Sequence, residues 1–187
     1  MARLTGRRMD RGNHYEQAFA AYLQQHHLGY VAVDQTRRSL WGPTPVKSLD
    51  FMLFGEDGNR YVVDVKGRRY PGGRTPRPRY TWECWTPRED VEGLERWAEL
   101  SGPGYRGLFV FMYHILPPVT LPDNTPDVWE WRGRRYLLRA VPSADYRLVM
   151  RARSPSWRTV TLPQSVFRSL ARPLSQFTRA VAEECPF

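Results

Sequence analysis

The first half of the chain alternates apolar and polar positions in a way that predicts a helix followed by a short strand. From Asn13 onward the apolar residues recur at helical spacing up to about His27. Asn13 is a good N-cap, and Glu16 follows three residues later, as in a capping box. Gly29 is the expected stop signal, and Tyr30–Val33 has the pattern of a short strand.

Two apolar stretches further on, Leu49–Phe54 and Arg60–Lys66, have the pattern of paired strands. The residues between them, 55–59, have the sequence Gly-Glu-Asp-Gly-Asn, which predicts a hairpin. The next segment, Gly67–Tyr80, is rich in Gly, Pro and Arg and is expected to be a loop, with a brief strand at Trp82–Trp85.

A second helix is marked at both ends. Thr86 is the expected N-cap, Pro87 the first helical residue and Glu89 the partner in a capping box, and Gly102 ends the helix. Its apolar face consists of Val91, Leu94, Trp97 and Ala98. The segment Gly107–Leu116 is nearly all apolar, which predicts a central strand buried on both faces.

Beyond residue 116 the pattern predicts strands at Arg135–Val141, Arg147–Arg153 and Trp157–Leu162, and short helices at Ser165–Leu170 and Leu174–Ala182. The 187 residues suffice for one domain with a substantial core. We therefore expect a single α/β domain over residues 1–187, with a core of about residues 13–116 and a C-terminal elaboration of about residues 117–187.

The loop of the first hairpin decides whether two carboxylates meet. If Glu56–Gly58 is a three-residue loop with Gly58 in the left-handed conformation, Gly55 pairs with Asn59, and Asp50 then falls directly opposite Asp64 on one face. A two-residue turn at positions 57 and 58 would instead put the two carboxylates on opposite faces of the sheet.

The chain carries a large excess of positive charge. Its 28 Lys and Arg residues outnumber 19 Asp and Glu residues, giving a net charge of +9 and a pI near 10.0. Such a balance favours a polyanionic partner, of which nucleic acid is the commonest, over a basic protein that binds no polyanion. Lys47 and Lys66 are the only lysines, so the lysine in the Asp64-x-Lys66 pattern suggests a role for which a compact ammonium group is needed.

Three acidic residues and this lysine form the candidate site. Asp64 and Lys66 share one face of their strand because side chains alternate with a period of two. Two like charges at Asp50 and Asp64 would be destabilising without a cation between them. Glu16 is a third carboxylate, although capping its own helix is an equally good interpretation. The plainer alternatives are a solvated Asp50 and an exposed Asp64–Lys66 ion pair.

The order of elements and these motifs resemble the PD-(D/E)xK nuclease superfamily, whose fold is the restriction-endonuclease-like α/β core. Asp50, in Ser-Leu-Asp, matches the first half of the motif, with Ser48-Leu49 where Pro is frequent. Residues 64–66 match the second half. More narrowly, the segment resembles a bacterial family named for the motif HYExAFE. The matching residues are His14, Tyr15, Glu16, Ala18 and Phe19, and this chain has Ala20 where the motif has its final Glu.

The resemblance implies a metal-dependent nuclease. Asp50, Asp64, the Val65 carbonyl and Glu16 would hold Mg²⁺ or Mn²⁺, and Lys66 would act as a base or an electrostatic clamp. DNA is favoured over RNA and an endonuclease over an exonuclease, with repair, recombination and defence all open. The alternatives are a nucleic-acid-binding module on the same fold that no longer cuts and, less favoured, a scaffold protein with a basic surface.

The arginines that follow Lys66 are candidates for contacts with phosphates: Arg68, Arg69, Arg74, Arg77 and Arg79. The aromatic residues Tyr70, Tyr80, Trp82 and Trp85 could stack on bases, but membership of the core is the favoured interpretation for them. The region around Trp157 and the terminal helices are candidates for a second substrate wall or the face of a homodimer, between which the sequence does not choose.

The remaining features bear on the cellular setting. The two cysteines lack CxxC spacing, which excludes a zinc ribbon. No apolar run approaches the ~20 residues that span a bilayer, and the N-terminus lacks the apolar region of a signal peptide. We therefore expect a cytoplasmic protein that does not associate with membranes.

Overall fold

The computed structural model describes residues 13–33, 40–41, 44–45, 49–56, 58–74 and 76–179. The N-terminal residues on which the signal-peptide expectation rests lie outside this part, as does the end of the predicted helix Leu174–Ala182. The described helices are α1 (Asn13–Gln25), α2 (Arg88–Ser101), α3 (Ser143–Val149), α4 (Gln164–Leu170) and α5 (Ser175–Thr178).

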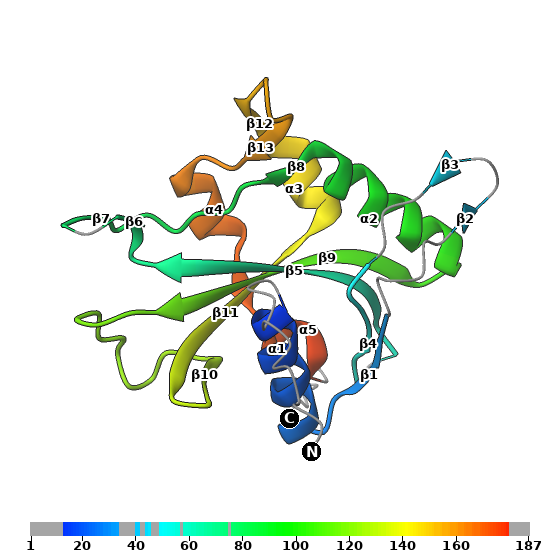
Figure 1. Ribbon diagram of the computed structural model, residues 1–187. Helices are drawn as coiled ribbons and strands as arrows, with labels where there is room; N and C mark the ends of the chain where they lie inside the picture. Colours follow the sequence, from blue (N-terminus) through cyan, green and yellow to red (C-terminus); the bar gives the residue numbers. More distant parts are fainter. Residues whose placement is uncertain are drawn as a thin grey trace, which may run out of the picture.

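A seven-stranded mixed sheet forms the centre of the molecule, in the order β1-β4-β5-β9-β11-β10, with β14 pairing to β11 (Figure 1). The strands of this sheet are β1 (Gly29–Ala32), β4 (Phe51–Phe54), β5 (Arg60–Tyr70), β9 (Tyr105–Ile115), β10 (Val128–Trp131), β11 (Arg134–Pro142) and β14 (Arg172–Pro173). The strands β5 and β9 are parallel over their whole length, and all other pairs in the sheet are antiparallel.

The smaller sheets lie outside this core. They consist of β12 (Arg151–Ser154), β13 (Thr159–Thr161) and β8 (Thr86–Pro87), of β2 (Leu40–Trp41) with β3 (Thr44–Pro45), and of β6 (Gly72–Arg74) with β7 (Arg77–Arg79). None of the helices in the described part of the chain has the length and apolar character needed to cross a bilayer.

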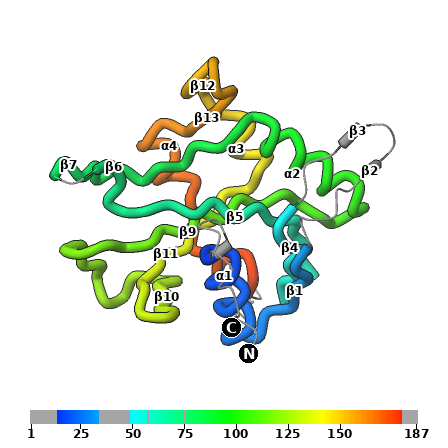
Figure 2. Tube along the Cα trace, viewed as in Figure 1, coloured from blue at the N-terminus to red at the C-terminus, as the bar shows by residue number. Residues whose placement is uncertain are grey.

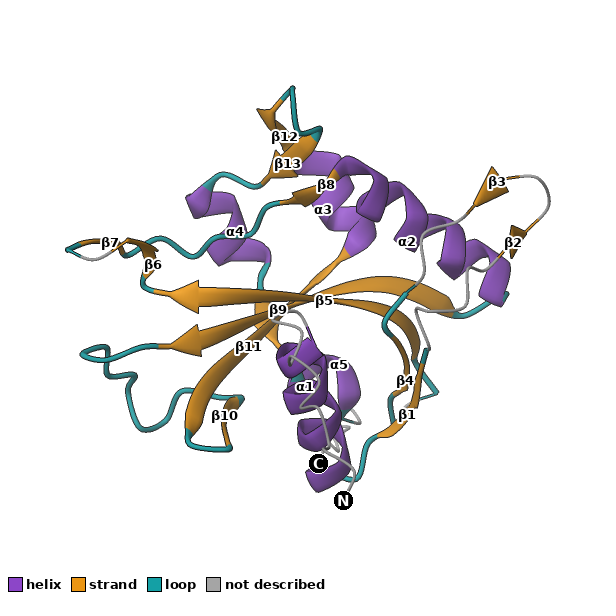
Figure 3. Ribbon diagram, viewed as in Figure 1, coloured by secondary structure: helices purple, strands orange, loops and turns teal. Residues whose placement is uncertain are grey.

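Helices cover both faces of the central sheet (Figures 1 and 3). The helices α1 and α5 pack on one face, where α1 buries Phe19 and Leu23. The helices α2, α3 and α4 pack on the other face, through residues such as Val91 and Phe167. The strand β9 therefore has buried side chains on both sides, as its continuous apolar sequence predicts.

The helix α1 is fixed against β5 at a glycine. A Cβ atom placed on Gly67 would lie only 2.2 Å from Cδ2 of Tyr15, so the aromatic ring occupies the space that any other residue would fill. The Tyr15 hydroxyl also donates a hydrogen bond to the Arg68 carbonyl, at 3.1 Å. The histidine and tyrosine of the HYE segment thus have a structural role, because His14 packs on the Tyr15 ring at 4.0 Å between ring centroids.

The helix α1 ends near His27 as predicted, but the residue that stops it is not Gly29. His27, with a φ of 54°, is the left-handed residue that terminates the helix, whereas Gly29 already belongs to β1. The amides of His27 and Leu28 donate to the carbonyls of Gln24 and Leu23, at 3.1 and 3.0 Å. These two hydrogen bonds make a Schellman motif, so the backbone pattern ends the helix without a glycine.

The start of α2 also differs. Pro87 precedes the helix, which begins at Arg88, and Thr86 pairs with Val160 in the small sheet. The Thr86 hydroxyl donates to the Asp90 carboxylate at 3.2 Å instead of serving as acceptor for a helix amide. The predicted capping box with Glu89 is therefore wrong, while the C-terminal position of Gly102 and the buried face with Val91 are confirmed.

Two further predictions are corrected. Residues 67–70 are not a loop, because β5 stays paired to β9 as far as Tyr70, and most of the remainder forms the β6–β7 hairpin that projects from the sheet (Figure 2). Residues 147–153 are not one strand, since α3 runs to Val149 and β12 begins at Arg151. The segment Trp82–Trp85 has no strand pairing, and the structure adds β10 and β14, which the sequence pattern did not reveal.

Candidate functional site

The first hairpin has the predicted register. Phe51 pairs with Val63, the Gly55 amide donates to the Asn59 carbonyl at 2.8 Å, and Gly58 is left-handed with a φ of 71°. The three-residue loop is therefore confirmed.

Asp50 directly precedes β4, at the end of the hairpin where the pairing of β4 with β5 stops. Its own amide donates to the Val63 carbonyl at 2.9 Å, and its carboxylate accepts a hydrogen bond from the Val65 amide at 2.6 Å. One carboxylate oxygen of Asp50 thus lies at the edge of β5, beside the face that carries Asp64. From Asp64 to Tyr70, β5 has no described strand neighbour on this side.

The environment of Asp50 disfavours its ionised form. Burial raises its pKa to about 8, and the charges of Asp64 and Glu16 act in the same direction. The Val65 amide and Lys66 oppose this shift without cancelling it. A buried carboxylate whose neighbours are mostly negative gains from a bound cation, so the electrostatics of this edge favour a metal ion.

Lys66 is held between two carboxylates from different elements. Its Nζ atom lies 2.6 Å from Oδ2 of Asp64 on β5 and 2.5 Å from Oδ2 of Asp90 on α2. Burial lowers the pKa of the Lys66 ammonium group, but the two carboxylates outweigh this effect and the net shift is upward. Lys66 is therefore a fixed positive charge beside Asp64.

Asp90 is the residue that the sequence interpretation missed. It is 3% exposed, lies in the first turn of α2, and joins Lys66 to Thr86. The dipole of the helix favours a negative charge at this end. The sequence offers one signal for Asp90, its position four residues after Thr86. The usual capping pattern pairs Thr86 with the residue three positions later, and therefore predicts Glu89 as the partner instead.

Glu16 is placed near this cluster by the docking of α1. It directly follows Tyr15, which fixes the helix over Gly67, and it is half-buried. Its negative charge contributes to the raised pKa of Asp50. The structure therefore brings Asp50, Asp64 and Lys66 to one end of the β4–β5 hairpin, and the charge of Glu16 acts on Asp50.

The donor set suits a cation that retains water ligands. Among the described residues, no three His, Cys, Asp or Glu side chains converge as a ready metal cluster. Because the amide and carbonyl of one residue point to the same side of a strand, the Val65 carbonyl faces the same edge as the Asp50 carboxylate. Mg²⁺ is commonly held by only one or two carboxylates together with waters and phosphate oxygens, and this edge offers that combination.

Of the five arginines predicted to contact phosphates, four are exposed and Arg68 is partly buried. Its guanidinium group lies 4.2 Å from the centroid of the Trp85 ring and donates to the carbonyls of Gly67 and Trp85. Burial lowers its pKa. Arg68 thus ties β5 to the segment before α2, and its guanidinium faces the protein interior.

The other four arginines are exposed. Arg69 lies on the opposite face of β5 from Arg68, while Arg74, Arg77 and Arg79 lie on the β6–β7 hairpin. Arg74 and Arg77 are direct cross-strand partners, an arrangement of like charges that is unfavourable without an anion nearby. Arg79 is paired with Glu83 at 2.9 Å.

Comparisons with protein-family models and with curated proteins give no match, so the similarity of residues 14–19 to the HYExAFE motif stays a prediction. Among solved structures, the fold is similar to the Holliday junction resolvase Hjc of Archaeoglobus fulgidus, an archaeal hyperthermophile. The TM-score is 0.51 at 13% sequence identity, and the match covers 88% of this chain and 98% of the other. At this identity the likeness shows the fold alone: the chain has a restriction-endonuclease-like α/β fold, as predicted from its sequence.

Proposed function

We propose that the protein is a metal-dependent nuclease that hydrolyses phosphodiester bonds in nucleic acid, with DNA favoured over RNA and internal cleavage over cleavage from an end. The observation that carries this proposal is the meeting of the buried Asp50 carboxylate with Asp64 and Lys66 where β4 leaves β5. The similarity in fold to a Holliday junction resolvase supports it.

Asp50, Asp64, the Val65 carbonyl and Glu16 would hold Mg²⁺ or Mn²⁺. The metal supplies charge neutralisation on the phosphate and lowers the pKa of water. Lys66, kept protonated between Asp64 and Asp90, stabilises the negative charge that develops on the phosphate oxygens. Its raised pKa favours the role of electrostatic clamp over that of general base.

The rival function is a nucleic-acid-binding module that has the fold but does not cut. The presence of Asp50, Asp64 and Lys66 as largely buried ionisable groups argues against this alternative, because a site without chemistry gains nothing from the cost of burying them. Incubating the protein with supercoiled, single-stranded and branched DNA and with RNA, in Mg²⁺, Mn²⁺ or EDTA, separates the two. Binding without metal-dependent products in every case would support the rival.

A stability measurement tests the metal site without activity. Because folding raises the pKa of Asp50 above its unfolded value near 3.8, the folded state binds more protons than the unfolded state between about pH 4 and pH 8. This group therefore makes the protein less stable as the pH rises through that window. We expect Asp50→Asn to raise the melting temperature at pH 8 and to change it little at pH 4.

Mg²⁺ should raise the melting temperature of the unmodified protein at pH 8, where Asp50 can ionise, and should have a much smaller effect on Asp50→Asn. Asp145→Asn, an exposed residue of α3, is the matched control and should respond to Mg²⁺ as the unmodified protein does. Equal stabilisation of all three proteins by Mg²⁺ would remove Asp50 from the metal site.

The β6–β7 hairpin should contribute sequence-independent affinity. Replacing Arg74, Arg77 and Arg79 together by Ala is expected to weaken binding of all sequences about equally. It should also flatten the slope of log K against log salt by roughly 0.7–0.9 for each phosphate that the variant no longer neutralises. Affinity measured at several salt concentrations gives this slope.

Arg79→Ala alone is the control for a structural role, because Arg79 is already paired with Glu83. If the hairpin arginines serve only the protein's own ion pairs, the triple variant will melt earlier and keep its salt slope. That result would exclude the hairpin from the nucleic-acid interface.

A further inference from the structure

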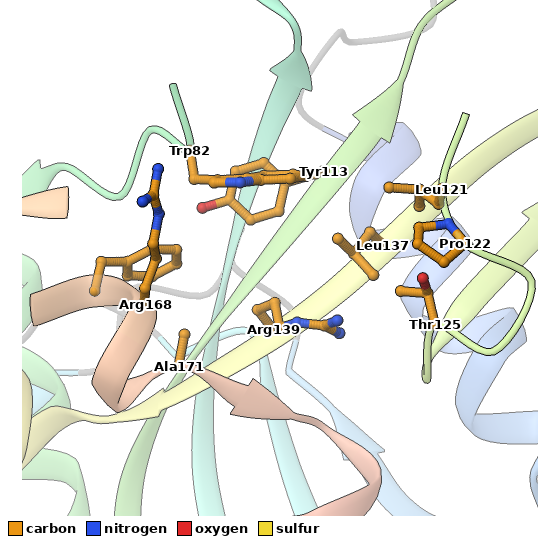
Figure 4. A pocket seen from close by; sticks show the side chains of 10 residues that line it. Trp82, Tyr113, Leu121, Pro122, Thr125, Leu137, Arg139, Arg168 and Ala171 are labelled. Carbon is orange, nitrogen blue, oxygen red and sulfur yellow. The ribbon is translucent and has the colours of Figure 1, made fainter. Parts of the chain in front are cut away.

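A pocket lies on the sheet face that carries Asp64 and Lys66. It has a volume of about 300 Å³ and lies between α4, β11 and the segment that follows β9 (Figure 4). Trp82 and Tyr113 form one wall, Arg139 and Arg168 supply positive charge, and Leu121 and Leu137 complete the apolar lining. This volume is at the lower limit of small-molecule sites, so the pocket has room for a group the size of one nucleotide.

Arg139 gives the pocket a positive charge that, among the described residues, is not held in a direct ion pair. Its Nη1 atom donates to the carbonyls of Pro126 and Leu138, at 3.1 and 2.7 Å. Burial lowers the pKa of its guanidinium group, an effect that the charge of Asp127 opposes without cancelling.

The Asp127 carboxylate is engaged elsewhere. It accepts hydrogen bonds from the Tyr22 hydroxyl at 3.1 Å and from the Ser175 amide at 2.9 Å. An arginine keeps its proton in proteins, so a half-buried guanidinium held only by carbonyl groups is a receptor for an anion. Arg168, exposed on α4, adds a second positive charge to the pocket lining.

The aromatic wall of the pocket is fixed in place. Trp82 stacks on Tyr70 with 3.6 Å between ring centroids and an angle of 2°. Tyr113 meets Trp82 edge-on at 4.8 Å, and its hydroxyl donates to the Glu83 carbonyl at 3.1 Å. A rigid aromatic wall beside an unpaired guanidinium matches a nucleotide, which combines a flat aromatic base with a phosphate.

The register of the sheet relates this pocket to the candidate site. Lys66 on β5 lies beside Phe111 on β9, and Phe111 lies opposite Arg139 on β11. Neighbouring strands are ~4.8 Å apart, so the backbones at Lys66 and Arg139 are separated by about 10 Å. Tyr70, on the same face of β5 as Lys66, reaches the pocket through its stack with Trp82.

From this arrangement we infer that the pocket binds one unpaired nucleotide of the nucleic-acid substrate, with the base against Trp82 and the phosphate at Arg139. The Arg168 guanidinium group points to the other side of the pocket (Figure 4) and would contact a neighbouring phosphate of the same strand. The inference rests on the proposed function, which it extends from nucleic acid in general to substrates with a single-stranded or branched segment. A base within an uninterrupted duplex is stacked on its neighbours and has no access to such a pocket.

The test uses the fluorescent base 2-aminopurine in EDTA, so that the oligonucleotide is not cut. One 2-aminopurine is placed in a single-stranded oligonucleotide and in the same oligonucleotide within a full duplex, and binding is followed by anisotropy. We expect the emission to be quenched on binding in the single strand and unchanged in the duplex. The free mononucleotide dAMP serves as competitor.

Three variants and a control locate the site. Arg168→Ala removes an exposed charge, Ala171→Phe fills the pocket, and Arg139→Gln removes the half-buried charge and is checked by a melting curve. Each is expected to weaken the quenched complex about tenfold, as for the loss of one charged hydrogen bond or of the space for the base. Arg96→Ala, an exposed charge on α2, should leave it unchanged.

Binding of the oligonucleotide without quenching, or quenching that survives Ala171→Phe, would overturn the inference. A free dAMP that binds with the same sensitivity to the variants, while the oligonucleotide shows no quenching, would make the pocket a site for a small molecule and would equally overturn it. Cleavage in Mg²⁺ without quenching would support the proposed nuclease activity and contradict the nucleotide pocket. Quenching without cleavage would support the nucleotide pocket and contradict the nuclease activity.

Discussion

Asp64→Asn should abolish metal-dependent cleavage while the chain remains folded. Asn has the size of Asp and can still accept a hydrogen bond, but it cannot neutralise a cation or pair fully with Lys66, which lies 2.6 Å away. Removal of one electrostatic contact of this kind costs an enzyme at least ~10²-fold in rate. Rates of product formation from supercoiled and branched DNA in Mg²⁺, compared with a melting curve, measure both effects.

Glu89→Gln, which removes an exposed carboxylate next to Asp90, is the matched control and should cut at the normal rate. If the Asp64→Asn protein cuts as fast as the unmodified protein, the proposed site is not the catalytic site.

Lys66→Ala should also abolish cleavage, and the structure shows why its stability needs a separate control. The change leaves Asp64 and Asp90 largely buried without their shared partner, a change that typically costs about 3–5 kcal/mol. The double variant Lys66→Ala/Asp90→Asn removes one of these charges and should regain stability without regaining activity. Lys66→Arg should cut poorly, because the planar fork does not fit the place of a compact ammonium group.

Gly67→Ala is expected to disturb the packing of α1 against β5. The new Cβ atom would lie 2.2–2.6 Å from three atoms of the Tyr15 ring, and that ring is held by His14 and Tyr136. Overpacking of this kind costs about 1–3 kcal/mol. Since α1 also carries Glu16, its displacement should lower activity as well, which melting curves and cleavage rates together would show.

Gly72→Ala is the matched glycine control, because its Cβ would meet no atom closer than 3.5 Å. The double variant Tyr15→Ala/Gly67→Ala should be less destabilised than the sum of the single changes, since the clash is then absent. If the losses of stability in the two single variants add up exactly in the double variant, the clash between Tyr15 and residue 67 is not the cause of the destabilisation.

The part of the site built from local sequence was predictable. The loop Glu56–Gly58 fixes the register of the hairpin through the left-handed Gly58, so the sequence limited the position of Asp50 to two turn types, and the structure has the one that brings Asp50 beside the Asp64 strand. The apolar run of β9 likewise predicts a central strand. These features depend on residues near one another in the chain, where steric rules decide the conformation.

The parts that depend on distant neighbours were not predictable. The sequence around Gly67 and Arg68 has the composition of a loop, yet pairing with β9 and packing against Tyr15 and Trp85 keep it in a strand. Asp90 pairs with Lys66 only because the crossover brings α2 against β5. Tertiary contacts override local propensity at these positions, and one sequence gives no direct signal for them.

The parallel pairing of β5 with β9 also has a consequence for the time course of folding. The β4–β5 hairpin closes a three-residue loop, so Asp50 and Val65 can meet early and at little entropic cost. The pairing with β9 must wait for the crossover of residues 71–104 to be placed, and such non-local pairing is slow. We expect the carboxylates to assemble first and the clamp between Lys66 and Asp90 to close last, so that the charge balance of the site is completed only when the whole core has formed.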